Sequence, residues 1–305
     1  MRRRPRSKAR SAPSERRRVI LVAGGALDPH QARVIAALAR RGAPCTPLLH
    51  GPDAFPVVTL DVPGAQLVVD GRAVAPDALW VRHDVFHALA DPRRAVVARA
   101  QAWFDTIVGW ASLRPEVWWP NRAAVTRRVD KIAQLGAAAK VGLRIPATRV
   151  TNDRAALAAD AAGLVAKPVS GGGLCRSVVG LLDGRPAAPQ PAFVQTRLDG
   201  PEVRAYVVGG RVLAWEILTD ALDHRADPRA PVRRVELPDP ERGLLLTLAR
   251  TLGLDFAAAD LKRDPADGAL VFLEINTQPM WTAYDNDCGG ELVDAIVDLL
   301  LDGRA

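Results

Sequence analysis

The feature that most limits how this chain can fold lies near its C-terminal end, where two short apolar runs flank a cluster of turn-forming residues. The runs are Leu254–Leu261 and Ala269–Ile275, and Arg263–Gly268 between them contains Asp-Pro-Ala-Asp-Gly. Turn formers between two apolar runs predict a β-hairpin. Folding the hairpin about this turn places Asp260 opposite, or diagonal to, Glu274. Facing residues of such a hairpin have Cβ atoms about 4.5–5.5 Å apart.

Two bare carboxylates on a half-buried sheet face repel each other unless something positive lies between them. Strand alternation predicts that Phe272, Glu274 and Asn276 share one face, and that the residues between them, such as Leu273, share the other. With the Asn276 amide oxygen beside them, Asp260 and Glu274 form an all-oxygen set of the kind that binds Mg²⁺. A solvated sheet face is the alternative that these residues alone leave open.

The composition indicates a globular protein. The chain has 305 residues, of which 49% are hydrophobic, enough for a large core and two or three subdomains. No run approaches the ~18 apolar residues of a membrane span, and no signal-peptide core follows the N-terminus. The three cysteines show no CxxC spacing, which argues against a disulfide framework or a zinc site. We therefore expect a cytoplasmic protein without a membrane segment.

Positive charge is concentrated in residues 1–18, which contain nine Arg or Lys residues and one acid. The whole chain has a net charge of +7, so the remainder is close to neutral. A tail without large apolar residues is expected to be disordered. It has the charge to bind nucleic acid or an acidic partner, but it lacks the aromatic residues of a base-stacking surface. A solvated leader is the simpler interpretation.

The residues after the tail predict a small α/β unit. A buried-type strand, Val19–Ala23, precedes Gly24–Gly25 and an amphipathic helix near Asp28–Arg41. The glycine pair lacks the GxGxxG spacing, so a dinucleotide site here has little support.

Further elements are expected between residues 66 and 141. They are a hairpin over Gln66–Val74, a strand over Leu79–Val85, a helix near Pro92–Leu113 and a helix over Asn121–Val141 that begins at an asparagine cap. The aromatic residues of the third element recur at spacings of three and four, which indicates a core-facing stripe.

Lysine is scarce, with five examples among 41 Lys and Arg residues. A chain that otherwise uses arginine can retain lysine where a compact point charge is needed. Lys131 falls within a predicted helix, where a solvated face is the alternative. Lys167 lies in the apolar strand Leu164–Val169, directly before the glycine-rich Ser170–Gly173, and a second strand is predicted over Ser177–Leu182. The pattern is not a Walker loop, but a glycine-rich hairpin tip can offer backbone N–H groups to phosphates. A flexible tip without a ligand is the alternative.

Two more strands carry charged residues. Ala192–Leu198 (AFVQTRL) ends at Asp-Gly, and Glu202–Val208 then places Glu202 and Arg204 on one face. An acid and an arginine facing a cleft suit a ribose hydroxyl and a phosphate or carboxylate, whereas cross-strand charge pairing is the alternative. The charged segment Asp223–Asp227 is long enough to cover a site.

In this order the segments resemble the ATP-grasp ligases over about residues 119–305. The resemblance rests on the series Lys131, Lys167-Pro168 with its glycine-rich loop, FVQTRL, Glu202-Val203-Arg204, Asp260, and Glu274-Ile275-Asn276. Trp119-Pro120-Asn121 and IPATRVTND look like the peptide-modifying ligases that install ω-ester or ω-amide crosslinks, the graspetide synthetases. INTQPMW looks more like the RimK-type glutamate ligases and glutathione synthetases.

The resemblance implies an α/β (α+β) protein with the ATP-grasp fold and an N-terminal, Rossmann-like pre-ATP-grasp domain. The implied divisions are a disordered tail at 1–18, the pre-ATP-grasp domain at 19–118, a central subdomain with a glycine-rich lid at 119–193, and a C-terminal subdomain with the metal site at 194–305.

The family also implies roles for individual residues. The expected ATP contacts are Lys131 and Lys167 at the phosphates, Ser170, Gly171, Gly172 and Gly173 in the lid, Gln195, Thr196, Arg197 and Leu198 at adenine, and Glu202 at the ribose. Asp260, Glu274 and Asn276 are the implied ligands of two Mg²⁺ ions, with Mn²⁺ as an alternative ion. Arg204 and Arg225 are implied to stabilise the transferring phosphoryl group or the acyl phosphate. Thr196 replaces a frequent glutamate, and Thr277-Gln278-Pro279 replaces the small-residue turn of the graspetide enzymes.

The implied activity is an ATP-dependent, ADP-forming ligase that joins a carboxylate to an amine or hydroxyl of an amino acid or peptide through an acyl phosphate. A small-molecule kinase with the same nucleotide site is one alternative. A nucleic-acid-binding protein is another, disfavoured because the positive charge is confined to the tail. A homo-oligomer, dimer or tetramer, is compatible with the family. Arg82, His83, Asp84 and the loop Asp220–Arg234 are the candidates for setting specificity.

Overall fold

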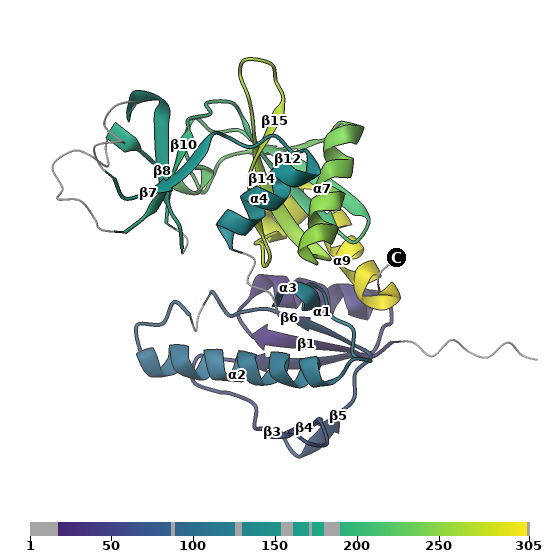
Figure 1. Cartoon of the computed structure of the whole chain (residues 1–305). Coiled ribbons are helices and arrows are strands. Elements are labelled where there is room, and N and C mark those ends of the chain that lie inside the picture. The colour runs from purple at the N-terminus through teal and green to yellow at the C-terminus, as the bar shows by residue number, and fades with distance from the viewer. Residues whose placement is uncertain are drawn as a thin grey trace, which may run out of the picture.

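The computed structural model describes residues 18–86, 89–125, 130–153, 161–170, 173–179 and 190–303. Within these residues the strands form four sheets. A parallel sheet from the first part of the chain lies at one end of the molecule, and the sheets from the second half lie at the other (Figure 1). The predicted tail falls outside the described residues except for Arg18. None of the helices in the described ranges has the length and apolar character to cross a membrane.

The N-terminal sheet is a three-stranded parallel sheet in the order β2-β1-β6. Its strands are β1 (Ile20–Gly25), β2 (Cys45–His50) and β6 (Ala78–Val81). Helices α1 (Pro29–Arg40) and α2 (Arg94–Leu113) lie on opposite sides of it (Figure 1). Because β1 is buried on both faces, Ile20 and Val22 pack into one core while Leu21 and Ala23 pack into another. The predicted α/β unit is therefore present.

A small antiparallel sheet projects from this unit. It contains β3 (Val58–Asp61), β4 (Gln66–Val69) and β5 (Arg72–Val74). The predicted hairpin corresponds to β4 and β5, joined by Asp70 and Gly71 with φ angles of 45° and 76°. Two consecutive residues with positive φ are typical of a type I′ turn, which matches the twist of the flanking strands. β3 was not predicted.

The predicted single helix over residues 121–141 is two helices. The structure has α3 (Arg122–Val125) and α4 (Lys131–Val141), with extended Asp130 before α4. The Asp130 carboxylate accepts a hydrogen bond from the Ala133 N–H, so it starts a new helix. The Asn121 side chain instead bonds to the backbone of Asp255 and Phe256. Lys131 is consequently the first residue of α4.

The central sheet is antiparallel, in the order β7-β10-β8-β9. Its strands are β7 (Thr148–Thr151), β8 (Leu164–Pro168), β9 (Arg176–Ser177) and β10 (Ala192–Thr196). A 3₁₀ turn over Ala161–Gly163 leads into β8. Ser177 of the strand predicted over Ser177–Leu182 lies in β9, but Val178 and Val179 are helical and contradict its continuation. The rest of that prediction lies outside the described residues.

The C-terminal sheet has five antiparallel strands in the order β13-β12-β11-β14-β15. They are β11 (Glu202–Val208), β12 (Arg211–Ile217), β13 (Val232–Val235), β14 (Phe256–Arg263) and β15 (Leu270–Asn276). A 3₁₀ turn, His224–Ala226, interrupts the β12–β13 connection. Residues of α4 and α7 (Asp239–Leu252) share a core with one face of this sheet.

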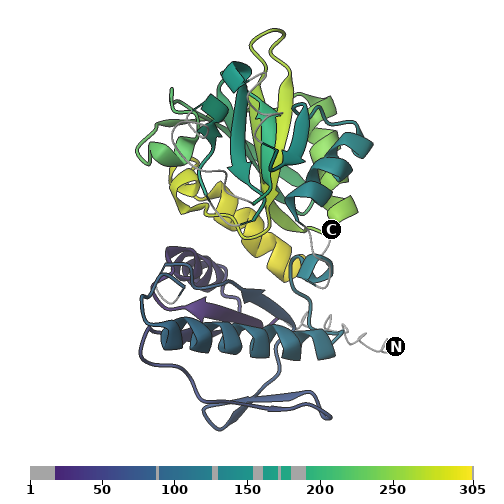
Figure 2. The same cartoon turned by 60° about the vertical axis from the view of Figure 1, so that its left-hand side comes forward.

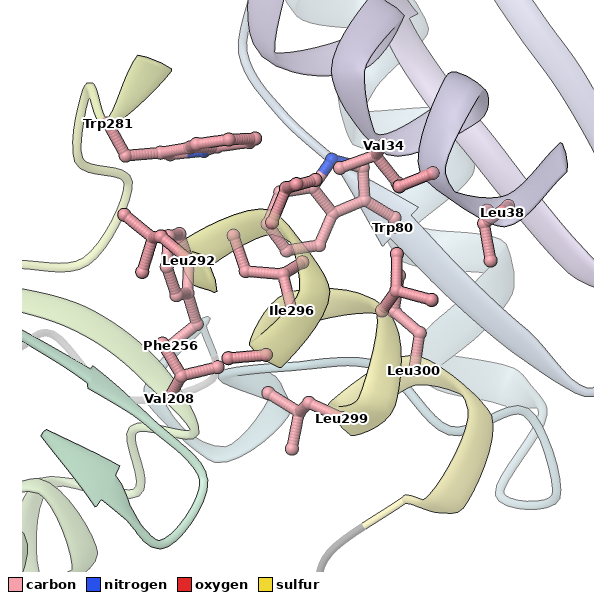
Figure 3. Close-up of a cluster of buried hydrophobic side chains, with 14 of the residues drawn as sticks. Val34, Leu38, Trp80, Val208, Phe256, Trp281, Leu292, Ile296, Leu299 and Leu300 are labelled. Carbon is pink, nitrogen blue, oxygen red and sulfur yellow. The ribbon is translucent and has the colours of Figure 1, made fainter. Parts of the chain in front are cut away.

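The other face packs on α9 (Glu291–Asp302), which lies between the C-terminal sheet and the N-terminal unit; Figure 2 shows the helix running between the two. α8 (Thr282–Asp287) precedes it. In Figure 3, Ile296 and Leu300 of α9 lie between Val34 and Trp80 of the N-terminal unit and Phe256 of β14. One core therefore joins the two ends of the molecule.

Candidate active site

A cavity of about 70 Å³ is lined by both the central and the C-terminal sheets, and we call it the first cavity. Eight residues expected from the sequence to act together line it. They are Lys167, Gln195, Thr196, Leu198, Glu202, Arg225, Asp260 and Glu274. These residues come from β8, β10, β11, β14, β15 and the β10–β11 and β12–β13 connections, so the fold gathers side chains from more than 100 residues of chain.

Other predicted residues lie elsewhere. The Arg197 guanidinium bonds to Asp199 Oδ1 at 2.6 Å, and Arg197 does not line the cavity. Ser170 is exposed, and the Gly173 carbonyl accepts a hydrogen bond from Arg225 Nη2 at 3.2 Å. Gly171 and Gly172 lie outside the described residues.

Asp260 and Glu274 pair directly across β14 and β15, as predicted, but the predicted alternation along β15 is wrong. The register shifts between Asp260 and Leu261, so Leu273 and Glu274 both line the first cavity, while Phe272 and Ile275 pack into one core. An extra residue in one strand leaves two residues opposite one and re-aims the side chains beyond it. The bulge therefore directs Glu274 into the cavity beside Asp260.

Three cations neutralise these carboxylates. Lys131 Nζ and Lys167 Nζ lie 3.0 Å and 3.8 Å from Glu274 Oε2. Arg204 Nη1 lies 2.8 Å from Asp260 Oδ1. The two lysines come from different elements, α4 and β8, and meet only in the folded protein. Each of these two carboxylates is thus paired with at least one cation.

Burial and these ion pairs shift the pKa values. Burial raises the pKa of Asp260 to about 6, although the Arg204 guanidinium opposes the shift. Burial also acts to raise the pKa of Glu274, but Lys167 and Lys131 outweigh it and the net pKa is lowered. Burial lowers the pKa of Lys167, with Glu274 opposing. The site stabilises negative charge at Glu274 more than at Asp260.

Asn276 follows Glu274 by two residues and lines a different cavity. Its Oδ1 accepts a hydrogen bond from the Gln278 N–H at 2.9 Å. In the described ranges, no group of three His, Cys, Asp or Glu side chains could hold a metal ion unaided. Two carboxylates and an amide oxygen nevertheless suit Mg²⁺, which is commonly held by one or two carboxylates together with substrate phosphates. Glu274 Oε2 lies against the ammonium groups of Lys131 and Lys167, so a metal ion at this oxygen would take the place of a lysine.

The structure adds functional candidates that the sequence interpretation missed. His224 Nδ1 lies 2.5 Å from Glu202 Oε1, and Asp223 Oδ2 accepts a hydrogen bond from the Cys175 N–H at 2.9 Å. Lys262 also lines the first cavity and donates to the Leu222 carbonyl at 3.0 Å. Lys262 lies two residues beyond Asp260 on a strand, so strand alternation could have found it. The position of His224 depends on a loop whose path the sequence does not determine.

The second cavity, of about 650 Å³, lies where the N-terminal unit meets the C-terminal end of β15. Its described lining is mainly aromatic and apolar, with Trp80, Phe104, Trp119 and Met280 among the largest side chains. Pockets for small ligands typically have volumes of about 300–1,000 Å³. β15 therefore borders two cavities, through Glu274 on one side and Asn276 on the other.

Of the three specificity candidates in the N-terminal unit, Arg82 and His83 line this cavity. The Arg82 guanidinium is used in an ion pair, whereas the His83 ring takes part in no ion pair among the described residues. Arg82 is buried and paired with Asp28, with 3.1 Å between Nε and Oδ2. Asp84 is also buried, 3.8 Å from His50. The ring of His83 stacks on Phe104 with a centroid distance of 3.5 Å. Arg82 and Asp84 are thus engaged within the protein.

Comparison with known proteins places this geometry in a family. No family model matches the chain. A D-alanine–D-alanine ligase of Gluconobacter oxydans (strain 621H) is 30% identical over 296 residues, covering 88% of this chain and 87% of the relative. A probable α-L-glutamate ligase 2 of Hahella chejuensis (strain KCTC 2396) is 32% identical over 117 residues, and this match spans 36% of that protein.

A solved structure extends the match across nearly the whole chain. The ATP-grasp ligase PsnB, in a complex with a minimal precursor, Mg and ADP, has a TM-score of 0.72 and 26% identity, covering 91% of this chain and 97% of PsnB. The near-complete alignment includes both the parallel N-terminal sheet and the two sheets that form the first cavity. On this evidence, the chain belongs to the ATP-grasp ligase superfamily and is a distant homologue of the RimK-type α-L-glutamate ligases.

Proposed function

We propose that this protein is an ATP- and Mg²⁺-dependent, ADP-forming ligase that joins a carboxylate to an amine or hydroxyl on an amino-acid or peptide substrate. The observation that carries the proposal is the arrangement at the end of β15. There Glu274 faces Asp260 in the first cavity and pairs with Lys131 and Lys167, and Asn276, two residues later, lines the second cavity. One cavity suits a nucleotide and the other a second substrate.

The first cavity is assigned to ATP. Gln195, Thr196, Leu198 and Leu273 offer a surface for adenine, and the Glu202 carboxylate is placed to accept hydrogen bonds from ribose hydroxyls. Lys131 and Lys167 are assigned to the phosphates, which would draw both lysines away from Glu274. About 70 Å³ holds only a few water molecules, so ATP entry requires the Leu222–Arg225 segment to move outward.

The chemistry requires no protein nucleophile. The residues bind ATP so that a substrate carboxylate attacks the γ-phosphorus and ADP leaves as the bond to the β-phosphate oxygen breaks. The amine or hydroxyl then attacks the acyl carbon, loses its proton and expels inorganic phosphate. Asp260, Glu274 and Asn276 would hold Mg²⁺, which when bound supplies charge neutralisation at the β- and γ-phosphates. Lys131, Lys167 and Arg225 add positive charge around the transferring group. Such preorganised groups each contribute about 10²–10³ in rate.

The second cavity is assigned to the amino-acid or peptide substrate. It adjoins Asn276, and its volume of about 650 Å³ accommodates several residues. PsnB and the macrocyclase MdnC have both been solved with precursor peptides, which supports a peptide substrate. The chemical nature of the product identifies the acceptor, because an amine gives an amide and a hydroxyl gives an ester.

The test is release of ADP and phosphate from Mg²⁺-ATP with pools of amino acids and short acidic peptides. Wild-type protein is compared with Glu274→Ala and with Glu236→Ala, whose carboxylate is 80% exposed and distant from the site. We expect substrate-dependent release of both products, a loss of about 10²-fold or more in Glu274→Ala, and no change in the control. ADP without phosphate would instead identify a kinase. Unchanged Mg²⁺ dependence in Glu274→Ala would overturn the assignment of the metal site.

A further inference from the structure

The loop that follows the proposed metal ligand Asn276 is held by hydrogen bonds at four successive residues, Thr277–Met280. The Thr277 carbonyl accepts from Asn121 Nδ2 at 2.9 Å, and Gln278 Oε1 accepts from the His83 N–H at 3.0 Å. The Pro279 carbonyl accepts from Arg82 Nη1 at 3.1 Å, and the Met280 carbonyl accepts from the Tyr206 hydroxyl at 2.5 Å.

Arg82 links this loop to the N-terminal unit through its side chain, beside the backbone link from His83. Its side chain is 3% exposed, and Nε bonds to Asp28 Oδ2 at 3.1 Å while Nη1 bonds to the Pro279 carbonyl. Asp28 is itself fixed as the N-cap of α1, where Oδ1 accepts from the His30 N–H at 2.8 Å. A guanidinium presents several donors in a rigid fork, so Arg82 can hold two acceptors at once in a fixed geometry.

From the loop, hydrogen bonds continue to two of the three proposed metal ligands, Asn276 and Asp260. On one side the Gln278 N–H donates to Asn276 Oδ1 at 2.9 Å. On the other, the Tyr206 hydroxyl that holds Met280 accepts from Arg204 Nε at 3.0 Å, and Arg204 Nη1 donates to Asp260 Oδ1 at 2.8 Å. A continuous path of mostly buried groups therefore runs from the cap of α1 to Asp260.

We propose that Arg82 is a positioning residue for the metal and phosphate site, acting through the Thr277–Met280 loop on Asn276 and, through Tyr206 and Arg204, on Asp260. The inference rests on the proposed function. It gives the N-terminal unit a part in the nucleotide chemistry although Arg82 does not line the first cavity. Replacement of groups that orient metal ligands typically costs about 10–100-fold in metal affinity or activity.

The test compares Arg82→Lys with Arg33→Lys. Arg33 also joins α1 to the C-terminal part, through Asp285 Oδ2 at 2.7 Å, but it does not contact the Thr277–Met280 loop. The readout is the Kd of ADP with and without Mg²⁺, measured by calorimetry together with ADP release. In Arg82→Lys we expect an unchanged Kd without Mg²⁺, and an improvement on adding Mg²⁺ that is about 10–100-fold smaller than in wild type. Arg33→Lys should behave as wild type.

A second variant separates loss of the Arg82 contacts from destabilisation by an unpaired buried charge. Asp28→Asn/Arg82→Met removes the buried pair without leaving one charge unpaired, and asparagine retains the helix cap. It should show the same loss of the Mg²⁺ effect. An undiminished Mg²⁺ effect in both Arg82 variants, or an equal loss in Arg33→Lys, would overturn the role of Arg82 and leave the proposed function unaffected. No Mg²⁺ effect in the wild-type protein would overturn the proposed function and this inference with it.

Discussion

Asp260 and Arg204 form a buried ion pair whose two charges depend on each other. Arg204 is 7% and Asp260 8% exposed, and the Arg204 guanidinium also lies over the rings of Tyr206 and Tyr284. Burial raises the pKa of Asp260 to about 6 even with this arginine present. Because the folded-state pKa lies above that of an unfolded aspartate, ionisation of Asp260 lowers the stability of the fold as the pH rises from about 4 to about 6, and the effect levels off at higher pH.

Arg204→Met should therefore destabilise the protein in a pH-dependent way. Without the arginine the pKa of Asp260 rises further. At pH values above that pKa, an unpaired carboxylate remains buried. We expect the free energy of unfolding to fall by about 3–5 kcal/mol at pH 8, with part of the loss recovered at pH 5, where Asp260 is protonated. Urea denaturation at the two pH values measures this.

Arg242→Met is the matched control for that experiment, because Arg242 forms an exposed i,i+3 pair with Asp239. Such a pair contributes about 0–1 kcal/mol. An equal loss at pH 5 and pH 8 in Arg204→Met would show that packing, and not the Asp260 charge, accounts for the effect.

At the scale of elements, the β12–β13 connection forms part of the wall of the first cavity. Asp223, His224 and Arg225 each contact a different neighbour, namely the Cys175 N–H, Glu202 and the Gly173 carbonyl. The segment therefore bridges the residues after the glycine-rich loop and the proposed ribose ligand. Burial acts to lower the pKa of His224, but the hydrogen bond and charge of Glu202 outweigh it, with a smaller contribution from Asp260, and the net pKa is raised.

ADP binding should consequently depend on the protonation of His224. The raised pKa means that the His224–Glu202 pair stabilises the fold fully below about pH 6.5, and that this contribution is lost as the pH rises through the folded-state value. Because ribose and protonated His224 compete for Glu202, ADP affinity should increase over the same pH interval. The Kd of ADP measured from pH 6 to 9 tests this. His224→Asn should remove the part of the pH dependence that comes from His224, while titration of Lys167 and of the ADP phosphates affects both the wild type and the variant. Identical profiles of Kd against pH in the two proteins would contradict the competition for Glu202.

Local sequence patterns predicted most elements but not all of their limits. The strands of the Asp260–Glu274 hairpin and α1 follow from apolar periodicity and turn chemistry. The division between α3 and α4 was missed, because Asn121 and Asp130 are both good cap residues and only the contacts of Asn121 with β14 show which of them starts α4.

At the scale of the molecule, α9 connects the N-terminal unit to the C-terminal sheet. Leu292, Ile296 and Leu300 are fully buried in the core that contains Trp80 from one side and Phe256 from the other (Figure 3). A helix that is apolar on more than one side is buried on more than one side. We therefore expect the two ends of the molecule to unfold together.

Ile296→Ala tests whether α9 couples the unfolding of the N-terminal unit to that of the C-terminal sheet. The change removes buried methyl and methylene groups and leaves a cavity, so it should lower the free energy of unfolding by about 2–5 kcal/mol within one cooperative transition. Ile132→Ala on α4 is the matched control, because Ile132 is 51% exposed. Two separate transitions in a calorimetric melt of Ile296→Ala would show that the two ends unfold independently.

The sequence by itself determined the α/β class, the hairpin that pairs Asp260 with Glu274, and most residues of the first cavity, because these depend on strand alternation, turn chemistry and the linear order of motifs. Only the tertiary structure decided which way the residues at the β15 bulge face, that Lys131 and Lys167 meet at Glu274, and that Arg82 holds the loop after Asn276. Each of these depends on how separate elements pack. Packing sums weak, non-local interactions, and no short stretch of sequence encodes them.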